Sequence, residues 1–316
     1  MVTVQLLIQL SSISRTPSWQ RRDNGLTIRM IVSFAILALL YTVFLSVLRV
    51  YLGLGFIPIT IIASLMILAQ WYFSDKIVLW SSGAKVVTRD QFPKLHDMVE
   101  RIVARNNLPK PKIAVINTNM PNAFATGKGR KSSVVAVTTG LMDILDDPEE
   151  LESVIAHELT HIRNRDVLVL TLASVFSTVA AYLMQFGFYG GLYGGGMGYG
   201  RDRNSGGTMI IVIVVSVLVW VISFLIIRAI SRYREFSADR GAAQMTGKPV
   251  KLANALMKIS GSMRRVPTKD LRQVEGLNAF FIIPAISGST ISNLFSTHPP
   301  VEKRVQKLME MEAFMS

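Results

Sequence analysis

Four long apolar stretches constrain this 316-residue chain more than any other feature of its sequence. They cover residues 31–48, 51–74, 167–200 and 209–227, and none of them contains a charged side chain. A helix needs about 20 apolar residues to cross the hydrocarbon core of a bilayer, whereas core helices of soluble proteins rarely run so far without a charge. The sequence therefore predicts a multi-span helical membrane protein whose four spans form two hairpins.

The charge and the residue composition indicate which partners and metal ligands this chain can have. Lys and Arg (34) outnumber Asp and Glu (21), which gives a formal net charge of +13. We find no nucleic-acid-binding motif and assign the excess charge to a surface that lies against anionic lipid. We therefore expect a lipid bilayer as a partner, and no nucleic acid. Cysteine is absent, so only His, Asp and Glu are available to hold a metal ion.

The spans divide the chain into five segments. A basic N-terminal segment (1–29) precedes the first hairpin (30–74), and a soluble segment (75–166) precedes the second hairpin (167–227), which a second soluble segment (228–316) follows. Lys and Arg concentrate outside the hairpins, and such residues mark the cytoplasmic side of a membrane. We therefore expect both termini and both soluble segments in the cytoplasm. No cleavage-site pattern follows the first apolar stretch, which favours a retained anchor.

The strongest chemical signal is the sequence His157-Glu158-Leu159-Thr160-His161, which has the pattern H-E-x-x-H. Residues four apart share a helix face, so the two imidazoles can bind one metal ion, and zinc is the metal that this pattern favours. Glu158 lies one position round the helix, where a base acting on water belongs. Asp147, with Glu150 three positions on, predicts the start of this helix as a capping box. The alternative is a surface helix with two unrelated histidines.

A pair of carboxylates follows the fourth apolar stretch. Glu235 and Asp239 are four apart, so they also share a helix face. A zinc enzyme with two histidine ligands needs one more protein ligand, and its histidines commonly donate their second N–H to a carboxylate. Two spans return the chain to the side on which His157 and His161 lie, so all four groups can meet. The pattern permits either carboxylate as the ligand, and a solvated charged face is the alternative.

The first soluble segment predicts a helix over residues 93–107 and β-branched strands over 112–116 and 133–139. The stretch between the two strands is either a hairpin connection or an edge strand to which an extended peptide could add. It contains Asn122, Ala123 and Phe124. The expected fold class is α+β and predominantly helical, with a small antiparallel sheet.

In this order, these residues resemble the HtpX family of integral-membrane zinc proteases, which is related to the CAAX prenyl proteases. The resemblance covers nearly the whole chain, and residues 1–29, which precede the first span, depart from it. It rests on the four spans and on the following residues: the H-E-x-x-H sequence, Asn122-Ala123-Phe124, Glu235, Asp239, and His298-Pro299 followed by Arg304.

The resemblance implies a zincin-like metalloprotease domain with one zinc ion per chain. It favours Glu235 as the third ligand beside His157 and His161, and Asp239 as the carboxylate behind them. It also implies that His298 and Arg304 assist at the transition state or bind substrate, as the Asn122–Phe124 stretch would. None of these roles follows from spacing alone.

We therefore expect a zinc endopeptidase of the cell membrane that hydrolyses misfolded or membrane proteins in quality control. Residues 75–166 and 228–316 would form its protease domain in two parts. Two alternatives remain open, namely a CAAX prenyl endopeptidase, which has the same chemistry, and a non-enzymatic membrane scaffold. The sequence leaves the natural substrates and the oligomeric state open.

Overall fold

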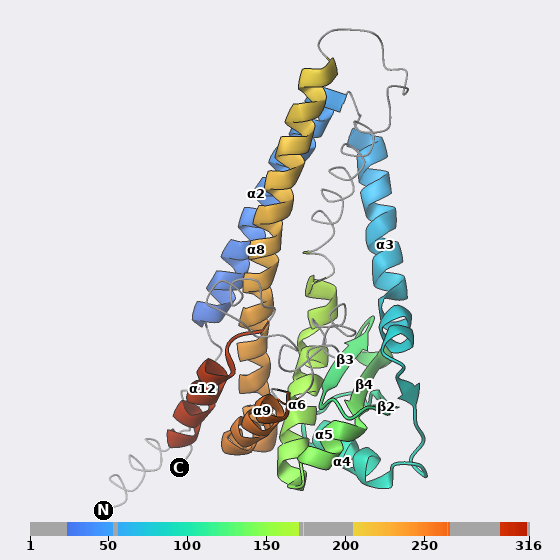
Figure 1. Ribbon diagram of the computed structural model, residues 1–316, viewed down its shortest axis with the longest axis vertical. Helices are drawn as coiled ribbons and strands as arrows, with labels where there is room; N and C mark the ends of the chain where they lie inside the picture. Colours follow the sequence, from blue (N-terminus) through green and yellow to red (C-terminus); the bar gives the residue numbers. More distant parts are fainter. Residues whose placement is uncertain are drawn as a thin grey trace, which may run out of the picture.

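The structure is a computed structural model that describes residues 24–52, 56–170, 173, 205–263, 265 and 298–314. Two long helices, α2 (Asn24–Leu52) and α8 (Ser205–Thr246), lie side by side along the tall axis of the molecule (Figure 1). Their contact buries Phe44 and Val219, while their outer faces expose large apolar side chains such as Leu39 (68% exposed). An apolar outer face on a long helix is the surface that a lipid environment requires.

The described residues test the four predicted spans to different extents. Within the described residues, two helical stretches are long and apolar enough to cross a membrane, and they match the first and fourth predicted spans. The second predicted span falls on α3 (Phe56–Ser81), a single helix that continues seven residues beyond the expected boundary at Ser74. Most of the third, over residues 167–200, lies outside the described residues, so the count of four stays a prediction.

The small sheet has four strands in the order β1-β2-β4-β3. The strands are β1 (Lys85–Val86), β2 (Lys112–Ile116), β3 (Ala123–Gly127) and β4 (Ser133–Thr138). The predicted antiparallel sheet is wrong in one pairing, because β2 and β4 run parallel while the other two pairs are antiparallel. The chain reverses direction twice, into β3 and out of it, and β4 then inserts between β2 and β3. Two reversals leave β4 parallel to β2, and β3 becomes an edge strand, opposite β1.

One face of the sheet packs on the soluble helices and the other on the end of α3. The main core joins Ile113 and Val135 of the sheet to Ile155 of the H-E-x-x-H helix and to Leu256. A second cluster packs Val78 of α3 against the opposite face of the sheet. The remaining described elements are α4 (Pro93–Arg105), η1 (Arg130–Ser132), α5 (Thr139–Ile144), α6 (Pro148–Asn164), α9 (Pro249–Met263) and α12 (Val301–Ala313).

Helix α6 begins and ends at residues that shape the site. Asp147 caps it by accepting a hydrogen bond from the Glu149 N–H, as predicted, but Glu150 pairs with Lys258 rather than closing a capping box. At the other end Arg165 has φ 57° and ψ 41°, in the left-handed region. The chain therefore does not continue as one helix from the motif into the third apolar stretch.

Candidate metal centre

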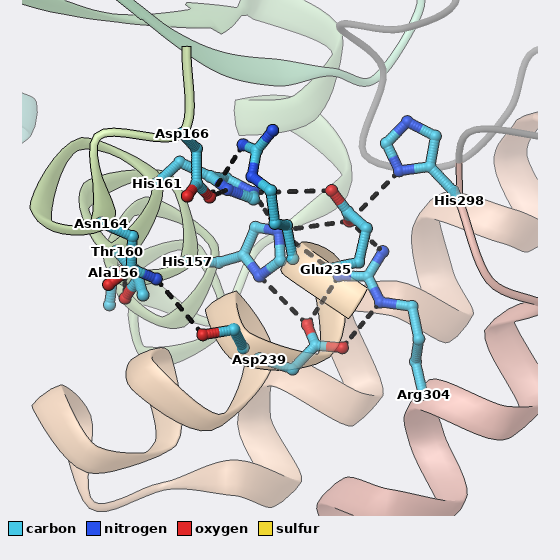
Figure 2. A network of polar contacts seen from close by, with 12 residues as sticks. Ala156, His157, Thr160, His161, Asn164, Asp166, Glu235, Asp239, His298 and Arg304 are labelled. Carbon is cyan, nitrogen blue, oxygen red and sulfur yellow. Dashed lines mark hydrogen bonds and ion pairs between the residues drawn. The ribbon is translucent and has the colours of Figure 1, made fainter. Parts of the chain in front are cut away.

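The centre lies where α6 and α8 pack against each other (Figure 1). Their close approach depends on Gly241, where a β-carbon would stand 2.3 Å from the Thr160 methyl carbon. Helix α6 contributes the H-E-x-x-H residues and α8 contributes Glu235 and Asp239, as Figure 2 shows. Residues separated by more than 70 positions thus meet in one buried cluster.

Three side chains present ligand atoms at distances suited to a single metal ion. The Nε2 atoms of His157 and His161 are 3.2 Å apart; the first lies 3.6 Å from Oε2 of Glu235 and the second 3.6 Å from Oε1. Ligands bound tetrahedrally at 2.0–2.1 Å stand about 3.3 Å from one another. The three separations lie close to that value. Two imidazoles and a carboxylate also form a donor set that zinc prefers, so the residues fit the ion.

Glu158 lies beside these three side chains. One of its carboxylate oxygens lies within 4.8 Å of a ring nitrogen of each histidine, and its side chain is buried. Burial is the largest influence on the pKa of Glu158 and raises it above its usual value. The backbone of Ala125 on β3 hydrogen-bonds the same carboxylate. Glu158 is therefore placed between the candidate ligands and the edge strand.

A carboxylate and a guanidinium stand behind His157. Asp239 Oδ1 lies 3.0 Å from His157 Nδ1, on the side of the ring away from Glu235. Arg304, which is 1% exposed, donates to both oxygens of Asp239, from Nε at 2.8 Å and from Nη2 at 2.6 Å. The same guanidinium places Nη1 3.2 Å from Glu235. Arg304 therefore lies against the carboxylates of the centre.

His298 closes the opposite side of Glu235. Its Nδ1 is 3.1 Å from Glu235 Oε2, and Figure 2 shows its ring pointing at that carboxylate from the segment that leads into α12. Burial alone would raise the pKa of Glu235, but the side chains around it, led by His298, hold the pKa well below its usual range. A lowered pKa favours the ionised carboxylate, which is the form that binds metal ions.

Two residues of the cluster, Asp166 and Arg234, were not predicted from the sequence as part of the site. Asp166 Oδ2 lies 2.5 Å from His161 Nδ1, and Arg234 donates to the same oxygen from Nη2 at 2.8 Å. All three side chains are largely buried. The sequence signal for Asp166 was a carboxylate directly before the charge-free stretch 167–200. Its spacing of five from His161, however, does not place it on the helix face of the H-E-x-x-H residues.

The predicted peptide-binding stretch falls on the edge strand. Asn122 exchanges hydrogen bonds with Thr138 at the end of β4. In an antiparallel pair the bonded residues alternate, so Phe124 faces β4 while the backbone N–H and C=O groups of Ala123 and Ala125 face away from the sheet. The contact between Ala125 and Glu158 agrees with this alternation.

Comparison with known proteins agrees with these observations. The model of "Peptidase family M48" matches residues 89–312. Protease HtpX homolog 2 of Methanosarcina mazei is 55% identical over 298 residues, which cover 94% of this chain and 99% of the relative. Protease HtpX homolog of Moorella thermoacetica is 53% identical, covering 93% of this chain and 96% of the relative.

The fold has a solved counterpart in S. mikatae Ste24p, with a TM-score of 0.52 over 90% of this chain and 66% of that one. The identity is only 16%, so this likeness concerns the fold alone. The sequence resemblance to HtpX proteases is confirmed by the relatives, and M48 peptidases depend on a metal, for which this chain has a suitable centre. The chain belongs to peptidase family M48 and is an HtpX-type membrane metalloprotease.

Proposed function

We propose that the protein hydrolyses peptide bonds with one zinc ion held by His157, His161 and Glu235. The observation that carries the proposal is the close approach of three side chains: the two histidine Nε2 atoms are 3.2 Å apart, and each lies 3.6 Å from a different carboxylate oxygen of Glu235. These separations suit tetrahedral coordination with a fourth position open to substrate. When bound, the ion supplies Lewis-acid chemistry that activates water and polarises the scissile carbonyl.

The protein's own groups then handle protons and charge. Glu158 takes the proton of the attacking water and returns it to the leaving amine. Its raised pKa, caused by burial, suits both steps because a general base works best when its pKa approaches the working pH. His298 donates to the developing oxyanion, which is supported by its position next to Glu235. Asp239 holds the ring of His157, and Arg304 holds Asp239.

The substrate binds as an extended strand along β3. Asn122, Ala123 and Phe124 form the start of this edge, and the outward backbone groups of Ala123 and the C=O of Ala125 can pair with a peptide, while the Ala125 N–H is directed at Glu158. Because Glu158 contacts Ala125, such a peptide would pass directly in front of the candidate base. Arg304 is too deeply buried to offer a first contact, so we assign it to the carboxylates rather than to the peptide.

The substrates are membrane or misfolded proteins, and the protease domain faces the cytoplasm from the cell membrane. Helix α8 supports this arrangement, because Arg228 and Arg232 follow its apolar part and the candidate ligand Glu235 comes three residues after Arg232. Basic residues at a span end mark the cytoplasmic surface. The protease domain would comprise residues 75–166 and 228–316. A cytoplasmic reporter fused after Ser316 should be active, and an external signal would contradict this orientation.

Metal analysis combined with casein cleavage tests the function. The purified chain should contain close to one zinc per chain and should cleave casein. A chelator should abolish cleavage, and added Zn²⁺, but not Mg²⁺, should restore it, because Mg²⁺ prefers oxygen ligands in an octahedron. A chain that lacks stoichiometric zinc, or that cleaves casein after complete chelation, would contradict the proposal and leave the scaffold alternative.

A further inference from the structure

Both histidines of the H-E-x-x-H sequence have a carboxylate and an arginine behind them. The first set, His157 with Asp239 and Arg304, belongs to the expected motifs of the chain. The second set consists of His161, Asp166 and Arg234, of which only the histidine was expected at the centre. In each set the carboxylate contacts the Nδ1 atom, which leaves Nε2 directed at the other ligands.

The contact between Asp166 and His161 depends on the break at the end of α6. In an uninterrupted helix, a residue five positions on points about 140° away round the axis. Arg165, in the left-handed conformation, ends the helix between the two residues, and its N–H returns to the carbonyls of His161 and Ile162. Asp166 is thereby turned back onto the His161 ring at 2.5 Å. The backbone pays a steric cost at this arginine, since non-glycine residues seldom adopt the left-handed region.

Arg234 fixes Asp166 from the other helix. It precedes Glu235 on α8, and its Nη2 lies 2.8 Å from the oxygen that contacts His161. Asp166 is 3% exposed and Arg234 6% exposed, so water screens this pair poorly. Within the described part of the chain, the Nε and Nη1 atoms of Arg234 make no hydrogen bond. Asp166 is therefore the partner that accounts for the burial of this guanidinium.

We propose that Asp166, held by Arg234, is the positioning residue of His161. It fixes the ring orientation and the tautomer in which Nδ1 carries the proton and Nε2 is free to bind the metal. The inference rests on the proposed role of His161 as a zinc ligand. Hydrogen-bonded carboxylates behind metal-binding histidines raise the basicity of the ring and hold it in place.

The location of this pair gives it a second role. Asp166 comes one residue before the third apolar stretch, and Arg234 comes seven residues after the fourth. The ion pair therefore joins the segment that leads into the third apolar stretch to the segment that follows the fourth. It does so next to His161, a proposed metal ligand. Asn164 and Ser237 add a hydrogen bond of 3.3 Å between the same two segments. The His161 side of the centre is thus held at the join of the second predicted hairpin.

The test compares Asp166→Asn with the wild-type chain, both purified at full length in detergent. Zinc affinity is measured by competition with a chromophoric chelator, and the ligand field by the visible absorption of the Co²⁺-substituted protein. We expect the zinc affinity of Asp166→Asn to fall by about 10- to 100-fold, the usual effect of removing a carboxylate behind a ligand. The Co²⁺ spectrum should shift, because the ring of His161 is no longer held; a purely structural defect would leave the spectrum of the folded fraction unchanged.

Arg234→Gln, combined with Asp166→Asn, removes the buried charge that the single variant leaves unpaired. If the single variant does not fold, this double variant decides the matter by the same two measurements. Where both can be measured, the double variant should bind zinc no more weakly than Asp166→Asn, because coupled residues are not additive. Asp97→Asn, which removes an exposed ion pair with Arg89, is the control and should match the wild type.

His161→Ala separates this inference from the proposed function. If His161→Ala retains stoichiometric zinc, His161 is not a ligand and the proposed function fails together with the inference. If His161→Ala loses zinc while Asp166→Asn, or the double variant, keeps wild-type zinc affinity and the wild-type Co²⁺ spectrum, only the positioning role is overturned. A weakened, spectrally shifted Asp166→Asn beside a zinc-free His161→Ala supports both.

Discussion

Gly241→Ala tests whether the spacing of α6 and α8 sets the metal centre. The added β-carbon would lie 2.3 Å from the Thr160 methyl carbon and 2.7 Å from its hydroxyl oxygen. Carbon atoms pack at about 3.5–4.0 Å, so the two helices must separate by roughly 1 Å at this point. Thr160 cannot easily turn aside, because it is buried within α6 and its hydroxyl donates to the Ala156 carbonyl.

The expected effect is large for the addition of one methyl group. Overpacking of a close contact costs about 1–3 kcal/mol of unfolding free energy. Gly261 supplies the matched control, since it lies in α9 and nothing stands within 4 Å of its added β-carbon. Gly261→Ala should be neutral or stabilise the helix by up to about 1 kcal/mol. Glu235 precedes Gly241 on the same helix, so the separation also moves the third candidate ligand away from both histidines.

The assay is the thermal midpoint of each purified variant, measured with and without added zinc, together with the zinc affinity. We expect Gly241→Ala to melt below the wild type and to bind zinc at least tenfold more weakly, because catalytic constellations tolerate displacements of only about 0.5 Å. Gly261→Ala should keep the affinity unchanged. If Gly241→Ala melts and binds zinc as the wild type does, the spacing of α6 and α8 does not control the site.

Three further predictions concern single groups of the centre. Glu158→Gln should keep its zinc but lose casein cleavage by about a hundredfold or more, as expected for a general base; retained turnover would refute the assignment. Glu235→Ala should lose stoichiometric zinc, whereas Asp239→Asn should keep it with an affinity about 10- to 100-fold weaker, and elemental analysis showing the reverse would exchange their roles. Ala123→Pro removes an outward backbone donor of β3 and should impair cleavage at unchanged zinc content. The backbone of Phe124 faces β4 instead, so Phe124→Pro removes a donor within the sheet and should lower the thermal midpoint.

The parts of the site that follow local periodicity could be predicted from the sequence. His157 and His161 share a helix face at a spacing of four, and the same rule selects Glu235 and Asp239. The cap at Asp147 and the first and fourth apolar helices also depend on local sequence. Such features need no knowledge of the rest of the chain.

The parts that depend on the path of the chain could not be predicted. The parallel pairing of β2 and β4 arises because β4 inserts beside a strand far from it in sequence, and alternating apolar residues look alike in both pairings. Asp166 meets His161 only because Arg165 leaves the helical conformation, which is unusual for an arginine. Arg234 takes its role from a partner 68 positions away.

Helix α8 is a single rod of 42 residues that carries both an apolar stretch and Glu235. From its first residue to Glu235 it measures about 45 Å, and it has no break at which a tilt could be absorbed. A tilt of about 2° around its far end would move Glu235 by roughly 1.5 Å, which exceeds the tolerance of a metal site. Helices tilt to match the thickness of the surrounding bilayer. A change in membrane thickness that tilts α8 would therefore also displace Glu235, and the coordination geometry would depend on the thickness of the host membrane.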